Sequence, residues 1–330
     1  MARSAQTEDR FSTFVATLGR GPGRSRALTR AEAAEAFSMV LRSEADPHQI
    51  GAFLMLLRFR GEDADEVIGL VEAARAQAGL PWRDFGVALD WPSYGAGRTR
   101  GAPWFLLSAL ALARAGVTVL IHGSNDFTQG IDTADGLRAL DLEPADSATA
   151  AERDLRRNGF AYVPLRAMAP ALDDLLGMRR LFGLRSPVNT VARLLNPADA
   201  PAGVDGVFHP PYIDVHLSVA ERLGRHRLVV LKGGGGEAER TPLKPGTASV
   251  WDCGAGRSEL ALPAMEGLSP HAAAADTREL LASVWRGEAA PQTPVATVQA
   301  TIALALLALG RCTEPAAAMR DAGAIWAQRR

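Results

Sequence analysis

The chain has 330 residues, of which 47% are hydrophobic and 22% are charged, and 36 basic side chains stand against 37 acidic ones. So much apolar surface excludes a disordered chain, and the length favours two domains or one large α/β domain with an appendage. A net charge of −1 excludes a protein that is basic all over, but it leaves room for a local basic face. Among the basic residues only Lys232 and Lys244 are lysines.

The composition also predicts a reduced, cytoplasmic protein that does not span a membrane. The longest apolar stretch, Val295 to Leu309, is shorter than a bilayer span and is interrupted by Thr and Gln. The first residues lack the apolar core of a secretory signal. Cys253 and Cys312 are too few for a disulfide framework, and no Cys/His cluster has metal-ligand spacing.

Residues 1–85 predict a set of short helices. Three helix starts pair a capping residue with Glu or Gln three positions later, at Thr29/Glu32, Asp46/Gln49 and Asp63/Glu66. Apolar residues follow each start at helical spacing. Helices of this length cannot bury a complete core alone, so we expect one face to pack on another domain or subunit.

From residue 86 the pattern changes to strands alternating with helices, which predicts a larger α/β domain. A buried apolar run that follows a helix is typical of a parallel sheet. The expected strands are 87–89, 117–121, 161–163, 228–231, 248–253 and 259–262, and the expected helices are 104–115, 214–223, 295–309 and 314–328. The predicted fold class is α/β, with a small N-terminal helical domain and a central, largely parallel sheet.

Two glycine-rich segments follow predicted strands, where exposed backbone amides can bind phosphate. The first runs from Gly95 to Gly101 and includes Gly97 and Arg98. The second is residues 232–240, Lys-Gly-Gly-Gly-Gly-Glu-Ala-Glu-Arg. Neither matches a standard nucleotide-binding fingerprint, so each could equally be a plain flexible loop.

Other candidates are isolated basic residues. His122 ends a predicted strand and could donate to a phosphate or act as a general acid, or simply form a structural hydrogen bond. Arg179 and Arg180, with Arg185, could bind carboxylate or phosphate, or form a solvated helix face. His209 precedes two prolines and fits a turn, and no nucleophile–His–acid set can be assembled.

Together these segments resemble the anthranilate phosphoribosyltransferase family, glycosyltransferase family 3. Matching stretches, in the family's order, are 28–33, 49–58, 60–66, 115–123 and 178–197. The resemblance implies a nucleoside-phosphorylase-type fold in which residues 1–85, with helices from about 170–196, form a dimerisation domain. Residues 86–169 and 197–330 would form the α/β domain.

The chain departs from this family where the family binds its phosphoribosyl pyrophosphate donor. The family's Gly-Thr-Gly-Gly-Asp-Gly loop corresponds here to residues 91–97, and its Asn-Ile-Ser-Thr stretch corresponds to residues 102–105. Ile121 and Ser124 replace its motif lysine and asparagine, and Gly236-Glu237 replaces its magnesium-binding Asp-Glu pair. Pro92 removes a backbone donor. Losing metal and cation contacts to the leaving diphosphate weakens the transfer reaction, so ordinary anthranilate transfer is not expected.

These departures, with the 232–240 segment, resemble the YbiB-type branch of the family, whose members bind nucleic acid and lack the tryptophan-pathway activity. The resemblance implies a homodimer that binds DNA or RNA without sequence preference and needs no cofactor. Expected phosphate contacts are Lys232, Gly233, Gly234, Gly235, Gly236, Arg240 and Lys244, with His122, Arg179 and Arg180 in second rank.

The alternative is an active glycosyl or phosphoribosyl transferase that uses a phosphoribosyl donor with a different acceptor. Gly95, Gly97, Arg98 and Gly101 would then belong to the donor loop, Arg179 would hold the acceptor, and Glu237 would bind Mg²⁺.

Overall fold

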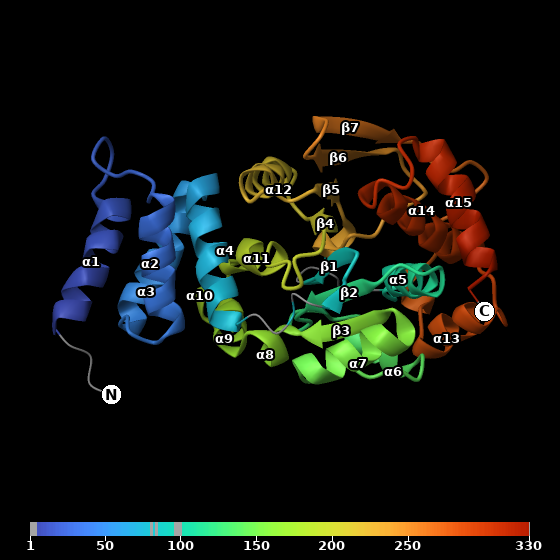
Figure 1. Cartoon of the computed structure of the whole chain (residues 1–330), viewed down its shortest axis with the longest axis horizontal. Helices are drawn as coiled ribbons and strands as arrows, with labels where there is room; N and C mark the ends of the chain where they lie inside the picture. Colours follow the sequence, from blue (N-terminus) through green and yellow to red (C-terminus); the bar gives the residue numbers. More distant parts are fainter. Residues whose placement is uncertain (1–4, 80–81, 83–84, 96–100, 330) are drawn as a thin grey trace. The chain divides into compact units, whose positions relative to one another are not determined.

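The computed structural model describes residues 5–79, 82, 85–95 and 101–329, and the chain divides into two compact units (Figure 1). The helical unit comprises Met1–Leu80 and Met168–Leu195, and the α/β unit comprises Pro81–Ala167 and Asn196–Arg330. The predicted boundaries, after residues 85, 169 and 196, lie close to these limits. Among the described residues no helix is both long and apolar enough to cross a bilayer.

The helical unit is built from α1 (Ala5–Gly19), α2 (Arg30–Leu41), α3 (Pro47–Arg60), α4 (Ala64–Ala78), α9 (Pro170–Gly177), α10 (Arg179–Phe182) and α11 (Val188–Arg193). Helices α2, α3 and α4 each begin with the capping box that the sequence predicts. In each box the cap side chain and the third helical residue satisfy each other's backbone N–H groups. Helix α8 (Leu165–Met168) lies where the chain passes from one unit to the other.

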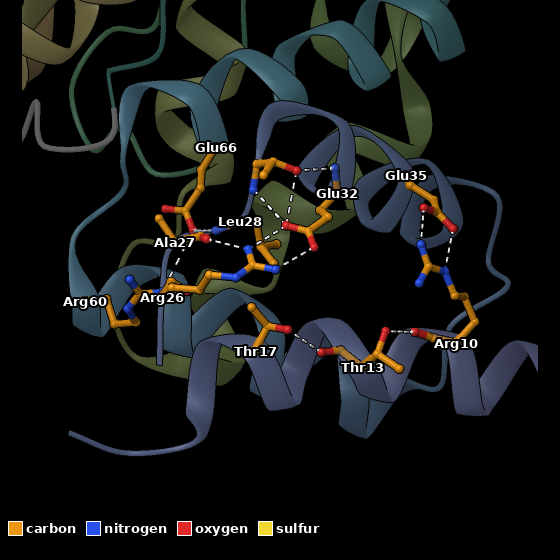
Figure 2. Close-up of polar contacts among 11 residues, drawn as sticks. Arg10, Thr13, Thr17, Arg26, Ala27, Leu28, Glu32, Glu35, Arg60 and Glu66 are labelled. Carbon is orange, nitrogen blue, oxygen red and sulfur yellow. Dashed lines mark hydrogen bonds and ion pairs between the residues drawn. The ribbon is translucent and has the colours of Figure 1, made fainter. Parts of the chain in front are cut away.

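Arginine–glutamate pairs link the first helices of this unit (Figure 2). Arg10 on α1 donates to Glu35 on α2, with Nε 2.7 Å from Oε1. Arg26 donates to Glu32 through Nη1 and Nη2, each at 2.7 Å. The hydrogen bond from Arg26, helped by the Thr29 N–H, lowers the pKa of Glu32 to about 2. These arginines neutralise local acids.

Glu66 on α4 is an acid buried in this unit, with 1% exposure. Its carboxylate accepts from the N–H of Leu28 at 2.8 Å and from the N–H of Asp63 at 3.0 Å. Burial nevertheless raises its pKa, because removal from water penalises the charged form more than these bonds favour it. Glu66 thus joins the segment before α2 to the start of α4.

A seven-stranded sheet forms the centre of the α/β unit, in the order β3-β2-β1-β4-β5-β6-β7. Its strands are β1 (Leu89–Ser93), β2 (Val119–Gly123), β3 (Phe160–Pro164), β4 (Ala202–Val207), β5 (Arg227–Lys232), β6 (Gly246–Asp252) and β7 (Gly256–Leu262). Strands β1 to β5 are parallel, and β6 and β7 pair antiparallel. The carboxyl ends of β1 to β5 therefore share one edge of the sheet.

Helices cover both faces of this sheet (Figure 1). They are α5 (Trp104–Arg114), α6 (Thr133–Arg138), α7 (Ala148–Asn158), α12 (Pro211–Arg222), α13 (Arg278–Arg286), α14 (Gln292–Ala308) and α15 (Pro315–Ala327), with 3₁₀ turns at Gly234–Gly236 and Ala273–Ala275. Val229 and Leu231 of β5 belong to the large core that includes α5 and α14, whereas Leu228 and Val230 pack with α12. This alternation is that of a strand buried on both faces.

Two strands differ most from the prediction. The first was expected at 87–89, but β1 runs from Leu89 to Ser93 and includes Pro92. Proline lacks a ladder donor, but β4 pairs with β1 only at Leu89 and Asp90, so Pro92 lies where β1 has one strand partner. Strand β4 was not predicted, because its glycines weaken the strand signal.

Candidate functional site

A cavity of about 420 Å³ opens at the carboxyl edge of the sheet, entirely within the α/β unit. It is lined by Gly101, Ala102 and Trp104 at the start of α5, by residues from 232–243 after β5, by His271, Ala273 and Asp276, and by the first turn of α14. Parts of both predicted glycine-rich segments, Gly101 from the first and Lys232, Gly234, Gly235 and Glu239 from the second, therefore line one site. This edge of a parallel sheet is the usual place for ligands in α/β proteins.

The glycines after β5 fix the path of the loop. A Cβ on Gly233 would lie 1.6 Å from the Glu237 carbonyl oxygen, and a Cβ on Gly206 of β4 would lie 2.3 Å from that oxygen. Gly235 and Gly236 have φ of +67° and +86°, the left-handed region that favours glycine. The backbone here turns directly against β4.

Only part of the predicted amide cradle is present. The N–H of Gly233 donates to the Val207 carbonyl at 3.0 Å, and the N–H of Gly236 donates to the Gly233 carbonyl at 3.1 Å. The prediction that these two amides bind phosphate is wrong for this conformation, because the turn itself uses them. Gly234 and Gly235 line the cavity, and the structure gives their N–H groups no partner among the described residues.

The two lysines remain exposed. Lys232 ends β5 and lines the cavity, while Lys244 lies beyond the cavity lining on the segment before β6. Neither ammonium group forms an ion pair with another side chain within the described ranges. Lys232 is therefore the cationic side chain that the site offers at its opening.

Arg240 does not contribute to the surface of the site. It is only 4% exposed, its Nη2 donates to the Pro263 carbonyl at 2.6 Å, and its backbone N–H donates to the Thr301 hydroxyl at 3.1 Å. Burial lowers the pKa of this guanidinium. The prediction that Arg240 binds phosphate is wrong for this conformation, because its side chain points into the protein and anchors the loop.

The start of α5 is capped by side chains that are distant in sequence. Pro103, at the N-cap, makes no side-chain cap bond. Instead the Phe105 N–H donates to Glu239 Oε2 at 2.8 Å, and the Ala102 N–H donates to Asp276 Oδ2 at 2.8 Å. His271 Nε2 lies 2.5 Å from the other Asp276 oxygen. Two carboxylates thus lie at the helix end where an anion is most favoured.

His122 is withdrawn from the site. The ring is fully buried, its Nδ1 lies 2.9 Å from the Tyr94 hydroxyl, and its Nε2 lies 3.3 Å from Asp90 Oδ1. Burial alone would raise the pKa of Asp90, but the charges of His122 and Arg225, with their hydrogen bonds, outweigh it and lower that pKa. The prediction of a phosphate contact is wrong for this conformation, because the ring sits inside a buried charged network.

Gly95, Arg179 and Arg180 are not among the residues that line the cavity. Arg179 and Arg180 belong to α10 of the helical unit, where Arg180 is exposed. The Gly95 carbonyl accepts from the Thr128 hydroxyl at 3.2 Å. Gly97 and Arg98 fall outside the described residues.

Two protein-family models match the chain. The model described as "Glycosyl transferase family, helical bundle domain" matches residues 13–78, and the one described as "Glycosyl transferase family, a/b domain" matches residues 105–326. The chain belongs to glycosyl transferase family 3.

Family members with names and structures are similar to the chain over most of its length. An anthranilate phosphoribosyltransferase from Moorella thermoacetica is 32% identical over 86% of this chain and 85% of its own, and one from Beijerinckia indica is 32% identical over 82% and 77%. The crystal structure of anthranilate phosphoribosyltransferase from Thermus thermophilus has a TM-score of 0.80 at 24% identity, covering 97% of this chain and 95% of that one. The Saccharomyces cerevisiae enzyme in complex with PRPP and Mg has a TM-score of 0.76 at 15% identity, over 98% and 95%.

Glu237 is the residue that the resemblance to this family assigns to Mg²⁺. Its side chain is buried at 2% exposure, and the Ser93 hydroxyl donates to its Oε1 at 3.4 Å. No group of three or more metal-ligating side chains occurs in the part of the chain that the structure describes. Gly236 stands where the family's pair has Asp, so Glu237 lacks that adjacent carboxylate, and Glu239 is the next one along the chain. Mg²⁺ needs only one or two protein carboxylates when substrate phosphates complete its coordination shell, so Glu237 would have to hold it without the family's Asp.

Sequence reasoning missed the residues that shape the cavity of this family member. Glu239 lies inside the 232–240 segment but was given no role, and Trp104, His271 and Asp276 were not considered as site residues. Asp276 is 174 positions from Ala102, whose N–H donates to it, so no local sequence pattern predicts the contact. The sequence offered one signal of these site residues, which was the position of Glu239 inside the glycine-rich segment.

Proposed function

We propose that this chain is a homodimeric, YbiB-type nucleic-acid-binding protein that contacts the sugar-phosphate backbone without sequence preference and lacks anthranilate phosphoribosyltransferase activity. One observation carries the proposal. The N–H groups of Ala102 and Phe105, at the segment that corresponds to the family's donor-contacting stretch, are held by the carboxylates of Asp276 and Glu239.

This capping argues against a phosphorylated donor at the start of α5. A phosphate group would have to displace both carboxylates from the helix end or lie beside their negative charge. The cap also satisfies N–H groups that a ligand would otherwise use. The site therefore disfavours a multiply charged donor such as phosphoribosyl pyrophosphate.

The opening of the cavity keeps features that suit a phosphate backbone. Lys232 and Lys244 are exposed cations on one segment, and the Gly234 and Gly235 amides lie beside Lys232. Such contacts position a nucleic acid without reading its sequence. Because each site offers few cations, we expect moderate affinity that falls with salt.

Exposed apolar side chains support the dimer part of the proposal. Phe59 on α3 is 89% exposed and Leu181 on α10 is 81% exposed, with Leu184 at 45%. All three belong to the helical unit, to which the family resemblance assigns dimerisation. Where such side chains form one contiguous patch, that patch is typical of a surface that another subunit covers.

The test is fluorescence anisotropy with a labelled single-stranded oligonucleotide at several salt concentrations. We expect binding that weakens with salt, and a double Lys232→Ala, Lys244→Ala variant whose log–log salt slope is smaller by about 1.4, at about 0.7 for each lost phosphate contact. The matched control is Arg153→Ala on α7, which removes an exposed charge elsewhere. A dissociation constant no better than about millimolar at about 150 mM salt would overturn the proposal.

A second candidate is a transferase that uses phosphoribosyl pyrophosphate with another acceptor. The names of the curated relatives favour phosphoribosyl transfer, although their acceptor is anthranilate. Gly95 to Gly101 would then hold the donor, Glu237 the metal and Arg179 the acceptor. Titration calorimetry with phosphoribosyl pyrophosphate and Mg²⁺ separates the two functions. Saturable heat would favour this candidate, whereas no heat and no thermal shift would remove it.

A further inference from the structure

The cavity behind Lys232 has an interior that differs from its rim. Lys232, Gly234 and Thr241 are exposed, whereas Trp104, Thr293 and Thr297 are buried, and the Asp276 side chain is 2% exposed. A ligand that occupies the cavity would therefore place one end among rim residues and the other among buried ones. The two ends meet different chemistry.

The interior is rich in hydrogen-bond acceptors. Asp276 and Glu239 are carboxylates, which only accept when ionised, and the oxygens that already bond to Ala102, Phe105 and His271 each keep a second lone pair. The Thr293 hydroxyl donates to the Ser269 carbonyl at 2.6 Å, and the Thr297 hydroxyl donates to the Thr293 carbonyl at 2.9 Å. Both hydroxyl protons are therefore committed, and the oxygens have lone pairs left to offer.

An aromatic wall borders these acceptors. The ring of Trp104 lies 6.4 Å from the ring of His271, centroid to centroid, in an edge-to-face arrangement. Aromatic side chains beside a small polar pocket suit a flat, partly polar group. The rim, in contrast, presents donors: the Lys232 ammonium and the Gly234 and Gly235 amides.

We propose that this cavity binds one unpaired nucleotide of the nucleic acid, with its phosphate at Lys232 and an amino-bearing base inside. The inference rests on the proposed function and adds selectivity to it. Anions are excluded from the interior by the two carboxylates, while a base that donates from an exocyclic amine matches them. A volume of about 420 Å³ is in the range of small-ligand pockets.

The hydrogen-bonding groups of the bases determine how well each base fits the cavity. Cytosine carries an N4 amine that donates, whereas thymine presents a carbonyl oxygen at that position, which the carboxylates would repel. A paired base cannot enter, because its amine is engaged in the duplex. The protein should therefore prefer single strands that contain cytosine over oligothymidine, and should not distinguish sequences of duplexes.

The experiment compares labelled oligodeoxycytidine and oligodeoxythymidine of equal length by anisotropy, with a duplex as a third probe. We expect oligodeoxycytidine to bind at least about fivefold more tightly than oligodeoxythymidine, with similar salt slopes. Thr297→Val removes an acceptor without changing charge, and Asp276→Asn replaces an acceptor oxygen by a donor. Both should reduce the preference while leaving the salt slope unchanged.

Three outcomes separate this inference from the proposed function. Equal binding of the two oligonucleotides with a normal salt slope overturns the base site and leaves backbone binding intact. Absence of binding by any probe overturns both. Should Asp276→Asn melt at a much lower temperature, the comparison is made with Thr297→Val, and an unchanged preference in that variant overturns the base site.

Discussion

The starts of α2, α3 and α4 in the helical unit and the start of α5 in the α/β unit are capped in opposite ways. In the helical unit, α2, α3 and α4 are capped by residues within their own first turn, such as Thr29 with Glu32. In the α/β unit, α5 receives its caps from Glu239 and Asp276, which lie 134 and 174 positions away from their partners. Local caps define where a helix begins. Distant caps tie separate segments around a cavity, so their loss should alter ligand binding as well as stability.

The largest expected effect comes from the anchor of the distant cap. Arg240→Met removes the hydrogen bond to the Pro263 carbonyl inside the protein while keeping most of the side-chain volume. We expect the free energy of unfolding to fall by about 2 kcal/mol, because a buried carbonyl loses a charged donor. Urea denaturation measures the change.

The same variant separates anchoring from binding. Since the Arg240 side chain is buried, its replacement should leave the salt slope of nucleic-acid binding within error of the wild type. A slope reduced by the equivalent of one phosphate contact, with unchanged stability, would mean that Arg240 reaches the ligand after all.

A smaller effect on stability is expected from Glu239→Ala, which uncaps α5. We expect a loss of about 1 kcal/mol, together with a new thermal stabilisation by millimolar inorganic phosphate, because the freed N–H group and the helix end then accept an anion. Differential scanning fluorimetry with and without phosphate checks this.

The matched control is Asp46→Ala, which removes a local cap that accepts from the His48 N–H at 2.8 Å. It should lower stability by a similar amount, about 1 kcal/mol, without any response to phosphate. If both variants respond equally to phosphate, the distinction between local and distant caps has no bearing on the site.

The smallest effect concerns pH and the local cap at Glu32. Its pKa in the folded chain is about 2, below the ordinary value of 4.5, so its stabilisation is complete above about pH 4.5 and is lost as the pH falls toward 2. Because the Arg26 pair is partly exposed, we expect a loss of only about 0.5 kcal/mol. Acid titrations of the urea midpoint for wild type and Glu32→Gln measure it.

Glu66 acts in the opposite sense and must be included in that titration. Burial raises its pKa, so protonation of Glu66 favours the folded chain as the pH falls. The variant Glu32→Gln should therefore be less sensitive to acid than the wild type. A steeper acid loss in the variant would contradict the assignment.

Sequence reasoning succeeded where the determining contacts are local. The three capping boxes were predicted because each needs only residues three positions apart, and the strand ending at Lys232 was predicted from its apolar run. Sequence reasoning failed at β4, because Gly203 and Gly206 weaken the strand pattern of this buried segment. The glycines are there because neighbouring groups leave no room for side chains.

The site was harder to predict because a sequence does not show whether a side chain points to the surface or into the protein. Lys232 and Arg240 were grouped as cations of one segment, yet one is exposed and the other is 4% exposed. The charge of Arg240 suggested a ligand contact, while the carbonyl that it binds lies 23 positions away. Asp276 went unnoticed for the same reason.

The close approach of the Glu237 carbonyl to Gly206 limits how this site could be moved between proteins. A graft of residues 232–240 onto another family member would place the Glu237 carbonyl where a β-carbon at the position of Gly206 collides with it. The segment is therefore not a portable module. An engineer would have to transplant the strand glycine with the loop, and evolution would have had to acquire the two together.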